Sequence, residues 1–323
     1  MLPHAEIWLS VIIPSWNGAP YLRCALDSVV AQHDLQIEVI AVDDGSTDDT
    51  CAILAEYADR LNLTIVQRPC GQNWVRNTNY GMSLARGRFI CWLHQDDLWA
   101  PDRLAQLKPL LAAHSDATFV FHPASYIDAA GRRVGLLRCP ERHRTGRVPE
   151  EEVFAQLLVQ NFIAAPATLF RSDCLAQVGP LDESLWYLAD WDFWLRLTRS
   201  GTIAFHEAPL SCFRIHDASQ TWSRSNASED VESQFTRVLD RYLGDWQQAA
   251  TTSHRRATIT RAALFSAHCN LALMSSAHGD HSRLARIAPE FLRLGPRGWA
   301  LFFKHSRIVD RCVARLKIRY HRA

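Results

Sequence analysis

The stretch GRFICWLHQDDLWAP, residues 87–101, decides the fold that we expect for this chain. Its apolar run at 89–93 lies between a glycine and a polar cluster, which is typical of a short strand buried on both faces of a sheet. The polar cluster contains Asp96 and Asp97. At the carboxyl end of a strand in an open α/β sheet, two adjacent carboxylates form a hard oxygen site for Mg²⁺ or Mn²⁺. The alternative interpretation is that both aspartates only cap the helix expected from about residue 101.

Strands and helices alternate on both sides of this stretch. Apolar runs predict further strands, and amphipathic periodicity predicts helices between them; the strands are at 8–14, 37–42 and 63–66, and the helices at 21–30, 53–61 and 73–85. This spacing indicates βαβ units and a mostly parallel central sheet flanked by helices. No GxGxxG follows a strand and no GxxxxGK[ST] occurs, so the dinucleotide-fold and P-loop classes lose their main support. Any bound phosphate is therefore expected to be held through a metal ion.

The pattern becomes less regular after residue 101. We expect a helix to about 114, a strand from 118 that continues toward 127, and a mobile, Arg-rich loop over 131–149. A helix at 153–159, a strand at 167–170 and a short helix ending at Gly179 follow. Beyond Trp246 no strand pattern remains, so we predict an α/β domain at 1–245 and a helical extension at 246–323. That extension is expected to hold two helices within 251–287 and one amphipathic helix at 298–320.

Charge is distributed unevenly along the chain. The whole sequence of 323 residues carries +1, whereas residues 282–323 contain eleven Lys/Arg against two acidic residues, or +9. Two interpretations of this basic tail are open: helices that pack with a solvated basic face, or helices that lie on an anionic membrane surface, which we favour. A nucleic-acid partner has no supporting motif.

Cysteine usage and hydropathy bear on the compartment. Nine cysteines without CxxC spacing argue against a disulfide framework and a zinc site, and they fit a reducing cytosol. We find neither a signal-peptide pattern nor an uninterrupted apolar stretch of about 18 residues. The expectation is a cytoplasmic protein that sits at the inner face of the cell membrane without crossing it.

A second informative stretch is YLADWDFWLRL, residues 187–197. Spacing at i, i+3, i+4 and i+7 places four inward-facing side chains on one face of a helix: Trp191, Trp194, Leu195 and, just after the stretch, Thr198. Asp190 stands at the start of this helix, as a plain cap or as a functional carboxylate, and Asp192 is spaced to pair with Arg196. His216 follows a strand-like run at 212–215, where a lone histidine is more often structural than a ligand.

Four segments in this order and spacing resemble the family 2 glycosyltransferases, which are inverting, nucleotide-sugar-dependent enzymes of GT-A fold. The segments are SVIIPSWNGAPYLRCALDSVVAQ (10–32), EVIAVDDGSTDDT (38–50), ARGRFICWLHQDD (85–97) and ADWDFWLRL (189–197). The resemblance covers roughly residues 8 to 216. It implies that one group of residues surrounds the nucleotide-sugar donor, namely Pro14, Trp16, Asp43, Asp44, Arg76 and Asp96. It also implies a divalent metal at Asp96, with Asp97 beside it and His216 near the metal or the diphosphate, and Asp190 as the general base.

The sequence departs from the family pattern at two positions. His94 stands where the family has the first acidic residue of the D-x-D element. Ala189 stands where the family commonly has an acidic residue just before the base, and the charge of such a residue would raise the pKa of the base. We expect an enzyme that transfers a sugar to a hydroxyl of a glycan or lipid-linked acceptor in cell-surface polysaccharide synthesis, with 131–149, Trp186 and Tyr187 on the acceptor side. A non-catalytic nucleotide-sugar-binding homologue is the alternative. A nucleotidyltransferase is disfavoured, because residues 15–19 are not a Gly-rich basic loop.

Overall fold

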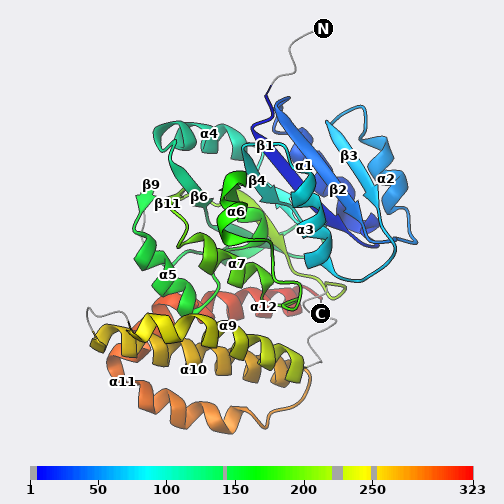
Figure 1. Cartoon of the computed structure of the whole chain (residues 1–323). Coiled ribbons are helices and arrows are strands. Elements are labelled where there is room, and N and C mark those ends of the chain that lie inside the picture. Colours follow the sequence, from blue (N-terminus) through cyan, green and yellow to red (C-terminus); the bar gives the residue numbers. More distant parts are fainter. Residues whose placement is uncertain (1–5, 141–143, 220–227, 249–252, 323) are drawn as a thin grey trace.

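The computed structural model describes residues 6–140, 144–219, 228–248 and 253–322. Among these residues the centre is an eight-stranded sheet in the order β3-β2-β1-β4-β10-β6-β11-β9 (Figure 1). Its strands are β1 (Leu9–Ser15), β2 (Ile37–Asp43), β3 (Leu63–Gln67), β4 (Phe89–Trp92), β6 (Ala117–Phe121), β9 (Gly146–Val148), β10 (Thr168–Arg171) and β11 (Thr202–Phe205).

The predicted parallel sheet is confirmed for β3, β2, β1 and β4. In the register of β1, Leu9 lies opposite Ile37 on β2 and Phe89 on β4, and every residue of β1 is buried. Beyond β4 the sheet is mixed, because β10 runs antiparallel to both β4 and β6, and β9 runs antiparallel to β11. The carboxyl ends of β2, β1 and β4 therefore meet at one edge.

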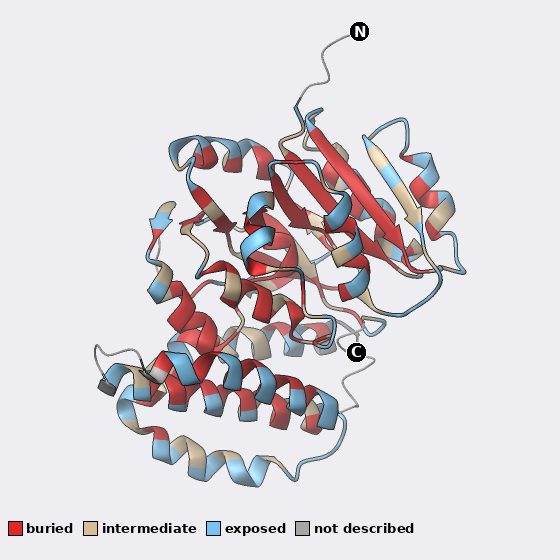
Figure 2. Ribbon diagram, in the orientation of Figure 1, coloured by how far each residue is buried: buried red, intermediate tan, exposed pale blue. Residues whose placement is uncertain are grey.

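Helices cover both faces of the sheet. Alternate side chains of β1 point to opposite faces, so that Val11 and Ile13 join one apolar cluster and Ile12 joins the other. The first cluster includes side chains of α1 (Ala19–Val30), α2 (Thr50–Glu56) and α4 (Arg103–Ala113). The second includes side chains of α3 (Trp74–Leu84), α5 (Glu150–Val159), α6 (Leu175–Val178) and α7 (Ala189–Leu197). Figure 2 shows the resulting buried interior between the helical layers.

Two expectations for the middle of the chain are wrong. The strand expected from 118 toward 127 ends at Phe121, because Pro123 has no N–H for a sheet ladder. The chain then enters a second sheet, β5-β12-β7-β8, formed among the described residues by β5 (Leu98–Trp99), β7 (Ala124–Ile127), β8 (Arg133–Leu137) and β12 (Ser211–Arg214). The segment expected to be a loop at 131–149 contains the strands β8 and β9, because hydrogen bonding to β7 and β11 outweighs the polar composition of the segment. Residues 141–143 of this segment lie outside the described residues.

The C-terminal part forms long helices, which are α9 (Ser228–Gln248), α10 (Ser253–Ala277), α11 (Leu284–Ser306) and α12 (Ile308–Arg322). The two helices expected within 251–287 are instead the single helix α10 and the start of α11. The amphipathic helix expected at 298–320 is divided at Arg307, whose φ of 49° lies in the left-handed region. Residue 246 lies inside α9, and buried side chains of α9 and α10 belong to the same cluster as those of α5 and α7. Figure 1 shows α9, α10 and α11 stacked beside one another.

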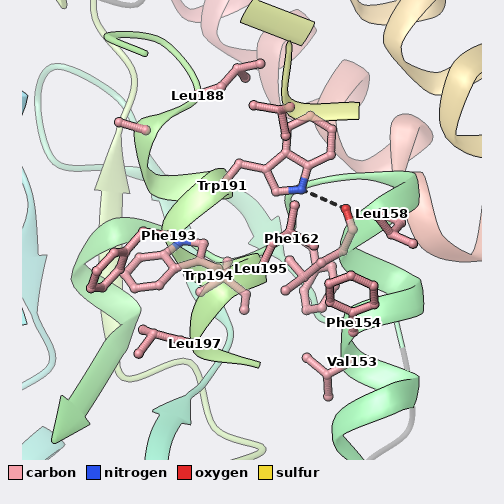
Figure 3. Packing of buried hydrophobic residues seen from close by; sticks show 14 of the residues in the cluster. Val153, Phe154, Leu158, Phe162, Leu188, Trp191, Phe193, Trp194, Leu195 and Leu197 are labelled. Carbon is pink, nitrogen blue, oxygen red and sulfur yellow. Dashed lines mark hydrogen bonds between the residues drawn. The ribbon is translucent and has the colours of Figure 1, made fainter. Parts of the chain in front are cut away.

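Helix α7 is buried on nearly all sides. The predicted inward residues are confirmed: Trp191 donates from Nε1 to the Leu157 carbonyl at 2.7 Å (Figure 3), and Trp194 stacks on Trp92 with ring centroids 4.8 Å apart. The predicted pair is also confirmed, because Arg196 Nε lies 3.0 Å from Asp192 Oδ2. These contacts fix the start of α7, where Asp190 stands. In the described part of the chain, no helix combines the length and the apolar composition needed to cross a bilayer.

Candidate active site

The loops that follow β1 and β4 are locked to each other at the carboxyl edge of the sheet. The Trp16 N–H donates to Gln95 Oε1 at 2.8 Å, and Gln95 Nε2 donates to the Trp16 carbonyl at 3.0 Å. Gly18 makes this approach feasible, since a Cβ there would lie 2.3 Å from Gln95 Oε1. The Gly18 N–H in turn donates to Thr50 Oγ1 at 2.8 Å, which adds the segment after β2 to the same assembly.

Asp43 and Asp44 are buried at the end of β2 and shape the neighbouring loops. Asp43 Oδ2 accepts from the Ser46 N–H at 3.1 Å. Asp44 accepts from the backbone N–H groups of Gly71 and Asn73 at 2.9 and 3.2 Å. Both carboxylates therefore hold the loops that follow β2 and β3 through backbone hydrogen bonds.

The other residues expected around the donor lie at the same edge. Pro14 is buried in β1, and Trp16 is half-buried at the start of the following loop. Arg76 is exposed in the first turn of α3, where its N–H donates to Asn73 Oδ1 at 3.1 Å. Because Asn73 is also held by Asp44, the first turn of α3 is tied to the end of β2.

Asp96 and His216 meet although they are far apart in the sequence. His216 Nε2 lies 2.8 Å from Asp96 Oδ2, and the His216 ring packs on Tyr21 with centroids 4.6 Å apart. Burial disfavours ionisation of Asp96, but the hydrogen bond to His216 keeps its pKa below the usual value. Arg214 Nε donates to the Asp96 carbonyl at 2.7 Å and fixes the backbone of this loop.

Asp97 and His94 lie on either side of Asp96 in the sequence and have different surroundings. Asp97 is buried, and its Oδ1 accepts from the Arg214 N–H at 2.9 Å; burial and the Asp96 charge raise the pKa of Asp97 well above its usual value. The His94 ring packs edge-on against Trp74 with centroids 5.1 Å apart, and burial lowers the pKa of His94. We infer that Asp97 supports the loop and that His94 is neutral.

The described residues contain no group of three or more His, Cys, Asp or Glu side chains arranged around a common metal position. The pair Asp96 and His216 nevertheless fits a divalent ion, because one carboxylate and one imidazole leave coordination positions for the oxygens of a diphosphate. His216 Nδ1 is buried without a hydrogen-bond partner among the described residues, so no second hydrogen bond fixes the tautomer of this ring.

Asp190 is the second residue of α7. Its Oδ1 accepts from the Trp191 N–H at 2.7 Å and its Oδ2 from Asn161 Nδ2 at 3.1 Å. Burial raises the pKa of Asp190 to about 6, against the lowering effect of these two hydrogen bonds. The acidic neighbour that Ala189 replaces is therefore not needed to make this carboxylate basic.

The segment just before α7 is held from two directions. Trp74 Nε1 donates to the Trp186 carbonyl at 2.8 Å, and the N–H of the same peptide unit, on Tyr187, donates to Gln234 Oε1 at 2.9 Å. Because the Trp74 ring also contacts His94, one side chain connects the loop of Asp96 to the segment that leads to Asp190.

The geometry accords with comparisons to known proteins. The chain matches the model of "Glycosyl transferase family 2" over residues 10–174. The chain belongs to glycosyltransferase family 2. Among its family 2 relatives, an uncharacterized glycosyltransferase of Rickettsia typhi is 30% identical over 233 residues, covering 72% of this chain and 71% of the relative. One from Nostoc sp. is 28% identical over 250 residues, covering 74% of this chain and 75% of the relative.

Solved structures show the same fold. The S. aureus TarS fragment 1-349 in complex with UDP-GlcNAc has a TM-score of 0.65 at 18% identity, covering 98% of this chain and 91% of that chain. The mannosyltransferase PcManGT from Pyrobaculum calidifontis, in complex with GDP-Man and Mn²⁺, has a TM-score of 0.54 at 17% identity, covering 98% and 88%. This family 2 chain therefore has the GT-A fold predicted from its sequence.

Several residues of the site were missed by sequence reasoning. Gln95 lies within a quoted motif, yet nothing in the motif shows that it binds the Trp16 backbone. Asn161, Gln234 and Arg214 contact the site from distant segments, and the sequence pattern around each of them carries no signal of that contact.

Proposed function

We propose that this family 2 glycosyltransferase transfers a sugar, with inversion, from a nucleotide-diphosphate sugar to a hydroxyl of a glycan or lipid-linked acceptor in cell-surface polysaccharide synthesis. One observation carries the proposal: a carboxylate–imidazole pair stands at the carboxyl edge of the sheet, and a separate carboxylate with a pKa of about 6 stands at the start of α7. Structural neighbours crystallised with UDP-GlcNAc and with GDP-Man and Mn²⁺ support this donor class.

The donor side is assigned from the loops at the sheet edge. Pro14, Trp16, Asp43 and Asp44 would surround the nucleoside, with Arg76 near the donor phosphates. Asp96 and His216 would hold Mn²⁺ or Mg²⁺, and Asp97 would support them through the Arg214 backbone. When bound, such an ion supplies Lewis-acid neutralisation of the charge that develops on the leaving diphosphate.

Asp190 is the proposed general base. It takes the proton of the acceptor hydroxyl as that oxygen forms a bond to the anomeric carbon, while the bond to the diphosphate oxygen breaks and its electron pair leaves with the diphosphate. With a pKa of about 6, roughly nine-tenths of Asp190 is ionised at pH 7. A single displacement from the opposite face gives inversion. A positioned base contributes typically ~10²–10⁴-fold in rate.

The charge and the exposed apolar residues of the C-terminal helices suggest where in the cell the enzyme acts. Residues 282–323 carry +9, and α12 exposes the apolar side chains Val309, Val313 and Leu316. An exposed apolar stripe within a cationic segment suits an anionic membrane surface. We therefore propose that residues 1–245 carry the chemistry and that residues 246–323 hold the enzyme at the cytoplasmic face of a membrane.

Ligand-dependent thermal unfolding tests the donor assignment. The full chain is heated with each of a panel of nucleoside diphosphates, with and without Mn²⁺; ligand at 100 times its Kd adds ~2.7 kcal/mol of stability. We expect a metal-dependent rise in Tm with one nucleotide, lost in Asp96→Asn and kept in the control Asp59→Asn, which changes an exposed aspartate. No shift with any nucleotide would overturn the proposal, and binding without turnover would favour the non-catalytic homologue.

A further inference from the structure

Helix α9 contacts the chain on both sides of Asp190. Before α7, the buried side chain of Gln234 accepts a hydrogen bond at Oε1 from the Tyr187 N–H at 2.9 Å. Within α7, the buried carboxylate of Asp192 accepts a hydrogen bond at Oδ1 from Arg241 Nη1 at 2.6 Å. Gln234 and Arg241 both belong to α9. The proposed base therefore stands between two anchor points that a single helix of the C-terminal region provides.

The first anchor point is a short hydrogen-bonded chain of Asp230 and Gln234, which we call the α9 clamp. Gln234 Nε2 donates to Asp230 Oδ2 at 3.1 Å, and the same carboxylate oxygen accepts from Trp186 Nε1. The clamp therefore holds the Trp186 side chain and the N–H of Tyr187 at once. The carbonyl of Trp186, in the same peptide unit as that N–H, is held from another direction by Trp74 Nε1 at 2.8 Å.

Burial of an amide at position 234 calls for an explanation other than packing. An amide buried away from water is costly unless its donor and its acceptor both find partners, and Gln234, which is 0% exposed, uses both. An apolar side chain of similar volume would fill the space without this requirement. A fully satisfied polar network, in contrast, fixes one arrangement of the groups that it joins. The group fixed here is the backbone three residues before Asp190.

We propose that the α9 clamp positions Asp190 for proton transfer, with Asp230 and Gln234 as positioning residues that fix the chain where it enters α7. This inference rests on the proposed function, since it concerns the base of the same reaction. A base must lie within hydrogen-bond reach of the acceptor hydroxyl, and a displacement of about 1 Å can cost ~10²-fold in rate. The residues proposed to surround the donor lie on β1, α3 and the loops after β2 and β4, so loss of the clamp should lower turnover and leave donor affinity unchanged.

Exchanging the amide and the carboxylate of the clamp in the full chain tests this role. Gln234→Ala leaves the Tyr187 N–H without its acceptor, and Gln234→Glu places a carboxylate oxygen where Nε2 now lies, 3.1 Å from Asp230 Oδ2. Sugar transfer is measured with the donor identified by the nucleotide panel and with membrane lipid extract as the source of acceptor. Each variant should lower kcat about 10- to 100-fold, with donor Kd changed less than about two-fold. Asp230→Asn combined with Gln234→Glu restores one amide and one carboxylate, so kcat should return to within about five-fold of wild type.

A control variant and a second measurement separate positioning from folding. Arg237, one turn beyond Gln234 on α9, is exposed, and its Nη1 donates to Ser184 Oγ at 3.0 Å in the segment before Trp186. Arg237→Gln should change kcat less than about two-fold. Hydrogen exchange of the Tyr187 amide reports the clamp without turnover. It should accelerate about ten-fold or more in Gln234→Ala and slow again in the double variant.

Wild-type kcat in Gln234→Ala would overturn the inference, whether or not the Tyr187 amide exchanges faster, because faster exchange alone means that the clamp only stabilises the fold. Unchanged exchange in Gln234→Ala would overturn it too, as would an equal loss of kcat in Arg237→Gln, a parallel loss of donor affinity, or a double variant that recovers nothing. A wild-type chain that binds the donor and transfers no sugar would instead show that the proposed function fails.

Discussion

Removing the hydrogen bond from Asn161 to Asp190 should shift the acid limb of the pH–rate profile upward. In the native site Asn161 Nδ2 donates at 3.1 Å to Asp190 Oδ2 and lowers the pKa of a carboxyl that burial has raised to about 6. A hydrogen bond to a charged group is worth about 1.5 kcal/mol, or about one pKa unit. In Asn161→Ala the pKa should therefore rise to about 7, because the ionised form loses a donor.

The expected change in activity depends on pH. At pH 6 the ionised fraction of Asp190 should fall from about one half to about one tenth, a loss of about five-fold in kcat/KM. At pH 7 the loss is about two-fold, and at pH 9 it nearly disappears. Steady-state kcat/KM measured from pH 5 to pH 9 checks this, since that ratio reports the pKa of the free enzyme.

A second asparagine provides the matched control. Asn79 exchanges hydrogen bonds with the Leu181 backbone at 2.8 and 3.0 Å and no described contact joins it to Asp190. Asn79→Ala should lower stability by about 1–2 kcal/mol without moving the acid limb. An unchanged or downward-shifted limb in Asn161→Ala would refute the assignment of the acid limb to Asp190.

Three further predictions concern stability. Gly18→Ala should cost about 1–3 kcal/mol in urea unfolding and weaken nucleotide binding, because the new Cβ would meet Gln95 Oε1 at 2.3 Å; unchanged nucleotide affinity would contradict the role of this contact. Asp192→Asn should cost about 2–4 kcal/mol, since a fully buried carboxylate paired with Arg241 at 2.6 Å is lost, and a cost below 1 kcal/mol would argue against the pair. Asp190→Asn should stabilise the fold by about 1–3 kcal/mol at pH 7.5. The pKa of Asp190 is about 6 in the folded protein against an ordinary value of 3.8, so the wild-type protein loses stability as the pH rises from about 4 to about 6. At pH 3.5 Asp190 is protonated in both states, so the stability gain of Asp190→Asn should vanish there.

The parts of the fold fixed by local pattern were predictable. The runs at 8–14, 37–42 and 89–93 are apolar because β1, β2 and β4 are covered on both faces, and the polar residues after them fall at one edge as parallel strands require. Helix α7 was also predictable, because Trp191 and Trp194 repeat at helical spacing. The carboxylates Asp43, Asp44, Asp96 and Asp190 follow from these elements.

The contacts between distant segments were not predictable. Asn161 reaches Asp190 across 29 positions, and Gln234 reaches Tyr187 across 47. β8 lies in the segment 131–149, whose overall composition is polar and Arg-rich, and it pairs with β7 as a strand of the second sheet. Helix α10 is contacted by α5, α9 and α11, so its sequence lacks the one-sided apolar stripe that would have predicted its full length.

The two departures from the family pattern have physical explanations in the structure. His94 is half-buried and packs against Trp74, and burial keeps it neutral, so it adds no charge to the loop of Asp96. Ala189 is buried at the start of α7, and desolvation alone raises the pKa of Asp190. Neither departure removes a group that the proposed reaction uses.

The most direct test of the central claim is the turnover of Asp190→Asn. Sugar transfer is measured with the donor identified by the nucleotide panel and with membrane lipid extract as the source of acceptor, and donor Kd is measured in parallel. Asparagine keeps the shape of the side chain but cannot take a proton at neutral pH, so kcat should fall by ~10²–10⁴-fold while donor Kd stays the same. A variant that keeps most of the wild-type kcat with unchanged donor Kd would contradict the account.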